Sequence, residues 1–275
     1  MGQVTQLETI SIEHRGEVDW LTLNRPSSLN AINAKMTEEL GGYFDRLFNT
    51  PEVRVVVMRG AGRAFCAGAD LKQPDAEASG ARGYPFGGGY AVQGAIADIY
   101  VKMRRCPQPI IALVHGPACG GGFAFALASD IRIAGESARM NAAFIRVGLS
   151  ACDMGVSYFL PRLIGASLAA ELMLTGRFIE APRALAMGLV SQVVPDAELE
   201  AAAQPLIDDM LFASPLGLRL TKEGLWASID AGSLQGAMAI ENRNQRLCAH
   251  TEEWAEGRNA FMEKRLPVYG VPQPV

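Results

Sequence analysis

Two turns of small residues carry the clearest chemical signal in this sequence. The first, RGAGRAFCAGADLK (59–72), follows an apolar stretch at 53–58, and the second, VHGPACGGGFAFALA (114–128), follows another at 110–114. Consecutive small residues let a backbone approach a ligand closely, and a helix that begins in such a turn offers unpaired N–H groups. Two such turns at the ends of neighbouring strands could direct two amides at one oxygen, as in an oxyanion hole. For either turn alone, glycines that only permit tight packing are the simpler interpretation.

The motifs of several other chemistries are missing from the sequence. GAGRAF lacks the third glycine of a dinucleotide-binding fingerprint, and no glycine run is followed by the GK[ST] of a phosphate-binding loop. No GxSxG or HExxH motif occurs, and His115 has no partners at a spacing typical of a catalytic triad. The five cysteines form no CxxC pair, so we expect no metal site.

Alternating strands and helices must position the two turns. Apolar patterning predicts strands at 8–12, 18–23, 53–58, 110–114 and 131–134, and helices at 34–48, 92–104 and 121–128. This alternation favours an α/β fold with parallel strands and right-handed crossovers. After about residue 195 only helices are predicted, at 196–212, 216–229, 232–249 and 252–264. We therefore expect a core at 1–195 and a helical C-terminal region at 196–275. A segment rich in Gly, Ala and Pro at 73–90 is expected to cover a pocket.

Composition narrows the class of protein further. The chain has 275 residues, of which 49% are hydrophobic and 20% charged, and its formal net charge is −4. No dense cluster of Lys and Arg is present, which argues against nucleic acid as a partner. Five unpaired-looking cysteines and an N-terminus without a secretory pattern predict a cytoplasmic protein. The uncharged stretch at 106–129 is interrupted by prolines and glycines, so we expect a buried strand, loop and helix there rather than a membrane span.

Four segments in order resemble the enoyl-CoA hydratase/isomerase (crotonase) superfamily. They are LNRPSSLNAIN (23–33), AFCAGADL (64–71), HGPACGGGFAFALASDIRIA (115–134) and LTGRFIEAPRALAMGLVSQVV (174–194). The resemblance extends from about residue 8 to residue 265. It implies a crotonase-like spiral of ββα repeats whose C-terminal helices build homotrimers, commonly paired into hexamers, and help to close the pocket. It also implies an acyl-CoA thioester as substrate, with no separate cofactor because CoA is part of that substrate.

The resemblance assigns roles to particular residues of the two turns. It places the oxyanion-hole amides on Ala69 and Gly121, whose N–H groups would hold the charge of a thioester enolate. Further residues are implied to lie along the CoA or acyl path, namely Ala67, Asp70, Leu71, Lys72, Gly120 and Phe144. Arg25 and Lys72 are expected to contact the phosphates, although each could equally be a solvated surface charge.

The chemistry served by such a hole depends on the acids beside it. Hydratases of this family use two glutamates, and their positions here are Ala124 and Phe144, which cannot transfer a proton. In many isomerase-type members an aspartate precedes a glycine turn, and Asp153 in GLSACDMGVSYFLPRLIG (148–165) takes that place. The resemblance therefore favours double-bond isomerisation of an enoyl-CoA with Asp153 as acid and base. Asp153 could instead cap the helix predicted at 155–163. Hydration by Asp153 alone, thioester hydrolysis and a non-catalytic acyl-CoA-binding subunit remain alternatives.

Overall fold

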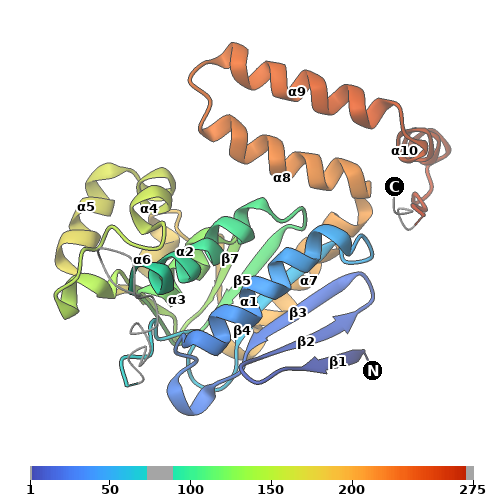
Figure 1. Ribbon diagram of the computed structural model, residues 1–275. Coiled ribbons are helices and arrows are strands. Elements are labelled where there is room, and N and C mark those ends of the chain that lie inside the picture. The colour runs from blue at the N-terminus through green and yellow to red at the C-terminus, as the bar shows by residue number, and fades with distance from the viewer. Residues whose placement is uncertain (1, 73–88, 271–275) are drawn as a thin grey trace.

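The computed structural model describes residues 2–72 and 89–270. Most of the segment expected to cover a pocket, residues 73–88, lies outside the described residues. The described chain is an α/β fold built around a seven-stranded sheet with a helical hairpin outside it (Figure 1). The α/β class expected from the sequence is confirmed.

The large sheet has the strand order β1-β2-β3-β4-β5-β7-β10. Its strands are β1 (Gln3–Gln6), β2 (Ile10–Arg15), β3 (Val18–Leu23), β4 (Val55–Gly60), β5 (Ile110–Val114), β7 (Ile131–Gly135) and β10 (Gln192–Val194). The first three strands pair antiparallel, and every pair from β3 to β10 is parallel. The carboxyl ends of β4 and β5 therefore meet at one edge, where the two turns of small residues begin.

A second, three-stranded sheet was not expected from the sequence. It consists of β6 (Pro117–Cys119), β8 (Arg139–Asn141) and β9 (Ile179–Glu180), with β6 parallel and β9 antiparallel to β8. These strands have only two or three residues, too few for an alternating pattern to be recognised. Because β6 belongs to the second turn, this small sheet fixes the backbone that leads into the following helix.

Helices cover both faces of the large sheet. On one face α1 (Ala34–Arg46), α2 (Gly89–Arg105) and α3 (Gly121–Ala128) pack against β4 and β5 in one buried cluster. On the opposite face α7 (Leu199–Phe212) packs in a second cluster through Leu199, Ala203 and Ile207. Strands buried on both faces explain why 53–58 and 110–114 read as almost continuous apolar runs. The sequence-based division at residue 195 assigned α7 to the C-terminal region, whereas the packing makes it part of the core.

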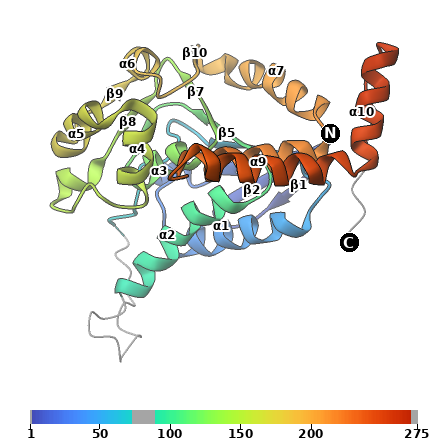
Figure 2. The ribbon, with the colours of Figure 1, turned by 90° about the horizontal axis from the view of Figure 1, so that it is seen from above.

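The remaining helices lie at one end of the core and outside it. Three short helices, α4 (Val156–Ile164), α5 (Ala166–Thr175) and α6 (Ala181–Ala186), lie together at one end of the core (Figure 1). Outside the core, α8 (Pro215–Ile229) and α9 (Leu234–Ala249) form an antiparallel hairpin. The next helix, α10 (Glu252–Glu263), lies at the open end of this hairpin, opposite the loop that joins α8 to α9 (Figures 1 and 2). No helix within 2–72 or 89–270 is long and apolar enough to cross a membrane. The uncharged stretch at 106–129 forms β5 and α3, as expected, but the short strand β6 lies between them where a loop was predicted.

A buried ion pair fastens the α8–α9 hairpin to the core. Lys222 of α8 lies 3.0 Å from the Asp130 carboxylate, and its side chain is only 4% exposed. The Lys222 ammonium also donates to the carbonyl oxygens of Met103 and Gln108. Asp130 accepts hydrogen bonds from the Trp226 indole and from the first amide of β5. One carboxylate thus joins α8 to the strand that leads into the second turn.

Replacing this carboxylate should destabilise the protein strongly. Asp130→Asn leaves the buried Lys222 ammonium without its counter-ion, so we expect the free energy of unfolding to fall by about 3–5 kcal/mol. Urea unfolding measures the loss. Glu171→Gln serves as the control, because it breaks a solvent-exposed pair with Arg183 and should cost less than about 1 kcal/mol. Equal losses in the two variants would contradict the anchoring role of Asp130.

Candidate active site

Backbone pairing brings the two turns of small residues side by side. Cys66 of the first turn and Ala118 of the second form a parallel bridge. The Cys66 N–H donates to Pro117 O at 3.1 Å, and the Cys119 N–H donates to Cys66 O at 2.9 Å. Ala69 and Gly121 each follow three residues after this bridge, Ala69 in the first turn and Gly121 in the second.

Gly68 shows how closely the turns approach. A Cβ atom at this position would lie 2.7 Å from Cys119 O and 3.5 Å from the Gly121 nitrogen. Gly68 also has a φ of +91°, which residues with a side chain rarely adopt. Glycine is therefore required here by both space and conformation, and the two turns touch through their backbones.

The amides of Ala69 and Gly121 are left unpaired by this arrangement. Ile32 bonds to the residues on either side of Ala69, with Ile32 N donating to Gly68 O at 2.8 Å and Asp70 N donating to Ile32 O at 2.9 Å. Gly121 is the first residue of α3, where an N–H group has no partner within the helix. Within the described ranges, neither the Ala69 N–H nor the Gly121 N–H donates a hydrogen bond. Both groups can therefore bind an acceptor, and the helix dipole of α3 favours a negatively charged one.

A buried asparagine holds the first turn in place. Asn30 is fully buried, and its amide nitrogen lies 2.8 Å from both Ala61 O and Ala64 O and 3.2 Å from Phe65 O. Its side-chain oxygen accepts the Arg25 N–H at 2.9 Å. No sequence pattern predicted a role for Asn30, because the three carbonyl groups that accept from its amide nitrogen lie more than thirty residues away in the chain.

Arg25 and Asp70 form an ion pair beside Ala69. The Arg25 guanidinium lies 2.9 Å from the Asp70 carboxylate, and the two side chains are 14% and 8% exposed. Arg25 also donates to Ala31 O at 2.5 Å, and Asp70 accepts the Lys72 N–H at 3.2 Å. The charge of Arg25 is thus neutralised within the turn, whereas the Leu71 and Lys72 side chains are exposed. Of the two cations expected to contact phosphates, only Lys72 extends into solvent.

Asp153 lies in the loop before α4 and does not cap that helix. Its carboxylate oxygen Oδ1 accepts the Met154 N–H at 2.8 Å and the Gln93 side-chain amide at 2.5 Å. The N-cap residue of α4 is Gly155, and no side chain caps this helix. The interpretation of Asp153 as a helix cap is therefore wrong.

Met154 connects Asp153 to the second turn. A Cβ atom on Gly121 would lie 2.9 Å from the Met154 sulfur and 3.0 Å from the Tyr100 hydroxyl oxygen. Tyr100 donates to Gly121 O at 3.0 Å and to the Met154 sulfur at 3.3 Å. Burial raises the pKa of Tyr100 well above its ordinary value, so the hydroxyl stays neutral and donates. The loop that carries Asp153 is in this way held against Gly121.

Ala124 and Phe144, which the resemblance places where hydratases carry glutamates, have apolar side chains. Ala124 is fully buried in α3. Phe144, in the 3-10 helix Ala143–Val147, is 6% exposed, and its ring would lie 3.4 Å from a Cβ atom on Gly120. The surface beside the second turn is therefore apolar.

The thiols near the turns are poor nucleophiles. Burial raises the pKa of Cys66 to about 12 and that of Cys119 to about 11. Both remain protonated near neutral pH, and a thiol reacts as a nucleophile only as its thiolate. We therefore interpret both as packing residues of the turns.

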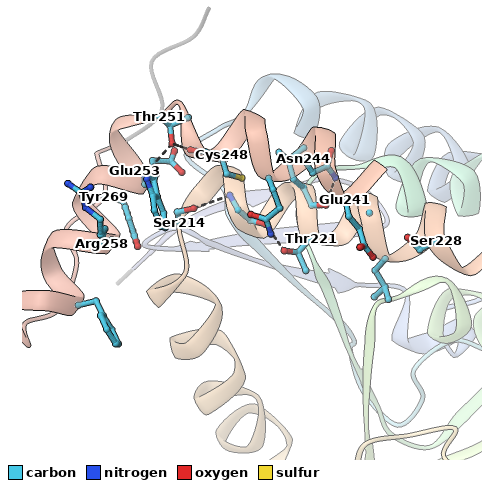
Figure 3. Close-up of a pocket in the computed structure, with 18 residues that line it drawn as sticks. Ser214, Thr221, Ser228, Glu241, Asn244, Cys248, Thr251, Glu253, Arg258 and Tyr269 are labelled. Atoms are coloured by element: carbon cyan, nitrogen blue, oxygen red, sulfur yellow. Dashed lines mark hydrogen bonds between the residues drawn. The ribbon is translucent and has the colours of Figure 1, made fainter. Parts of the chain in front are cut away.

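Of two grooves in the structure, one is lined by residues of the first turn and the other is not. One of about 510 Å³ lies between α1 and α2 and is lined in part by Ala69, Asp70 and Leu71. The other, of about 740 Å³, lies among α8, α9 and α10, with Ser214, Thr221, Cys248 and Glu253 along it (Figure 3). The larger groove has no residue of either turn, so size alone does not identify the candidate site.

Comparisons with known proteins identify the family of this chain. A family model described as "Enoyl-CoA hydratase/isomerase" matches residues 13–272. The chain is 40% identical to a Mycobacterium tuberculosis protein named "Probable enoyl-CoA hydratase EchA12", over 98% of this chain and 95% of that protein. It is 33% identical to the 1,2-epoxyphenylacetyl-CoA isomerase of Escherichia coli, over 90% of this chain and 93% of that protein.

A solved structure has the same fold. The crystal structure of an enoyl-CoA hydratase from Bacillus anthracis superposes with a TM-score of 0.87 at 34% sequence identity. The alignment covers 96% of this chain and 100% of that chain. The similarity therefore includes the C-terminal helices as well as the core.

The clamp formed by Asn30 can be tested through stability. Asn30→Asp keeps the shape of the side chain but replaces its N–H donors with a carboxylate facing three carbonyl oxygens. We expect the free energy of unfolding to fall by about 3 kcal/mol or more, because buried polar groups lose their partners. Asn49→Asp, at an exposed position, should change it by less than about 0.5 kcal/mol. A small effect at Asn30 in urea unfolding would show that this side chain does not hold the turn.

Proposed function

The chain belongs to the enoyl-CoA hydratase/isomerase family, and we propose that it moves the double bond of an enoyl-CoA thioester with Asp153 as its single acid–base group. The proposal is supported by Met154, which follows Asp153 and lies against Gly121, and by the apolar side chains of Ala124 and Phe144 at the positions where the resemblance implies the two hydratase glutamates. A double-bond shift needs one group that takes a proton and returns it, so a single carboxylate suffices.

The proposed reaction begins with a 3-enoyl thioester whose carbonyl oxygen accepts the Ala69 and Gly121 N–H groups. Asp153 removes a proton from Cα, and the electrons of that C–H bond form a Cα=C1 double bond while the carbonyl electrons move to the oxygen. The oxygen then re-forms the carbonyl, the Cα=C1 pair becomes the Cα=Cβ double bond, and the former Cβ=Cγ pair takes the proton from Asp153 at Cγ. The product is the conjugated 2-enoyl thioester, and Asp153 is again ionised.

The two amides would act on the charge that forms during this reaction. Negative charge builds on the thioester oxygen in the dienolate, and donors fixed in advance stabilise it without reorganisation. Loss of one such donor typically raises the barrier by about 2.7–4 kcal/mol. The apolar Phe144 and Ala124 provide no group to activate a water, which favours proton return over hydration.

The CoA part of the substrate is proposed to follow the first turn. Ala67, Leu71 and Lys72 would line its path, with Lys72 contacting a phosphate and Gly120 leaving room near the thioester. The Arg25–Asp70 ion pair supports this path by fixing the backbone next to Ala69. In this proposal Arg25 therefore holds the backbone of the first turn in place and does not bind a phosphate itself.

Hydration is the second candidate, because several relatives are named as hydratases. Asp153 would then deliver water to the double bond without a second carboxylate. The two reactions have different products, since hydration yields a 3-hydroxyacyl thioester and isomerisation yields a 2-enoyl thioester. Product analysis therefore distinguishes them.

We also propose that the C-terminal helices build a homotrimer, or a hexamer of two trimers. The exposed apolar side chains of α10 support this, with Trp254, Phe261 and Met262 being 52%, 82% and 73% exposed. Trp254 and Phe261 also line the groove among α8, α9 and α10. Contiguous exposed apolar surface of this kind commonly marks an interface.

The catalytic proposal is tested by Asp153→Asn with 3-enoyl-CoA as substrate. We expect at least a 100-fold loss of kcat, because general acid–base catalysis contributes about 10²–10⁴-fold. The absorbance of the conjugated thioester follows the reaction, and chromatography separates the 3-hydroxyacyl product. Asp208→Asn on the exposed face of α7 is the control and should keep wild-type activity. Equal turnover by Asp153→Asn would remove Asp153 from the mechanism, and substrate binding without turnover by the wild type would support a non-catalytic acyl-CoA-binding subunit.

Assembly is tested by placing charge on α10. Trp254→Glu combined with Phe261→Glu should reduce the trimer or hexamer to a smaller species, because a buried unpaired carboxylate is costly. Light scattering coupled to size-exclusion chromatography gives the mass. Val101→Glu, a similarly exposed apolar position on α2, should leave the mass unchanged. A monomeric wild type would contradict the proposed assembly.

A further inference from the structure

Both hydrogen bonds to the Asp153 carboxylate end on the same oxygen. The side-chain amide of Gln93 on α2 donates to Oδ1 at 2.5 Å, and the Met154 N–H donates to Oδ1 at 2.8 Å. Among the described residues, no group donates to Oδ2, and no cation forms an ion pair with Asp153. One oxygen is therefore held by the protein, and the other is available to a substrate.

Gln93 reaches Asp153 from a separate element. It is exposed near the beginning of α2, seven residues before Tyr100, so both side chains lie on the same face of the helix. Tyr100 bonds to Gly121 and Met154 on that face, and Gln93 bonds to Asp153. One helix face thus contacts both the second turn and the carboxylate.

We propose that Gln93 is a positioning residue that fixes Asp153 so that its oxygen Oδ2 takes the proton and returns it. This inference rests on the proposed acid–base role of Asp153. A hydrogen bond from a neutral amide stabilises the ionised carboxylate without supplying a charge that would hold it in an ion pair. Because Oδ1 is bound to two donors, rotation of the carboxylate is restricted. Oδ2 would therefore face both Cα and Cγ of the substrate.

Of the two donors to Asp153, Gln93 is the one that a substitution can remove. The titratable groups brought near the carboxylate are the Tyr100 hydroxyl on α2, which burial keeps neutral, and the exposed Cys152 thiol in its own loop. The Met154 donor is a backbone group and cannot be removed by substitution. Changing Gln93 therefore alters one donor while the backbone bond remains.

The test is the pH dependence of kcat/KM for 3-enoyl-CoA in Gln93→Leu. Loss of a donor favours the protonated carboxyl, so the acidic limb of the profile should move to higher pH, by about one unit for one charge-assisted hydrogen bond. Gln93→Glu places a second carboxylate beside Asp153 and should move the limb further in the same direction. KM should change little in either variant, because the effect acts through Asp153.

The matched control is Gln204→Leu on α7. Gln204 also donates to an aspartate, Asp208, at 2.7 Å on the protein surface, and its loss should leave the profile as in the wild type. If the acidic limb of the kcat/KM profile stays at the wild-type pH in both Gln93 variants, the proposal is overturned, even if the maximal rates of these variants fall.

A second readout does not depend on turnover. Infrared difference spectra between each protein and its Asp153→Asn counterpart follow the protonation of this carboxyl directly. The midpoint should rise in Gln93→Leu and remain unchanged in Gln204→Leu, and equal midpoints would overturn the proposal. An inactive wild type would defeat the proposed function, while the infrared comparison would still decide the role of Gln93.

Discussion

The close contact between two backbone turns is the constraint on which the candidate site depends. The parallel bridge between Cys66 and Ala118 sets their register, and Gly68 has no room for a side chain. Among the described residues, the Ala69 and Gly121 amides have no hydrogen-bond acceptor. Unpaired N–H groups are normally unfavourable in a folded protein, so their retention here is consistent with a function in binding negative charge.

Local sequence patterns predicted much of the core but not its long-range contacts. The helix at Gly121–Ala128 and the strand at Ile110–Val114 were predicted with their observed bounds. The small sheet was missed because its strands are too short to show alternation, and the packing of α7 on the sheet was not predicted because its apolar face is the same whether it covers a sheet or another helix. The roles of Asn30 and Gln93 depend on partners far away in the chain, so no local pattern could reveal them.

The candidate site has two parts, the paired backbone turns and the side chains that lie beside them. The paired turns supply donors that suit any reaction through a thioester enolate, as expected for a family whose members include hydratases and isomerases. The groups beside the turns would then select among reactions. Here Ala124 and Phe144 provide apolar contacts, and Met154, which follows Asp153, lies against Gly121.

The most direct measurement is a crystal structure of the protein with a saturated acyl-CoA thioester, which binds but cannot isomerise. We expect the thioester oxygen to lie about 2.7–3.1 Å from both the Ala69 and the Gly121 nitrogen, with the Asp153 oxygen Oδ2 facing Cα. A thioester oxygen that contacts only one of these nitrogens, or neither, would show that the two turns do not form an oxyanion hole.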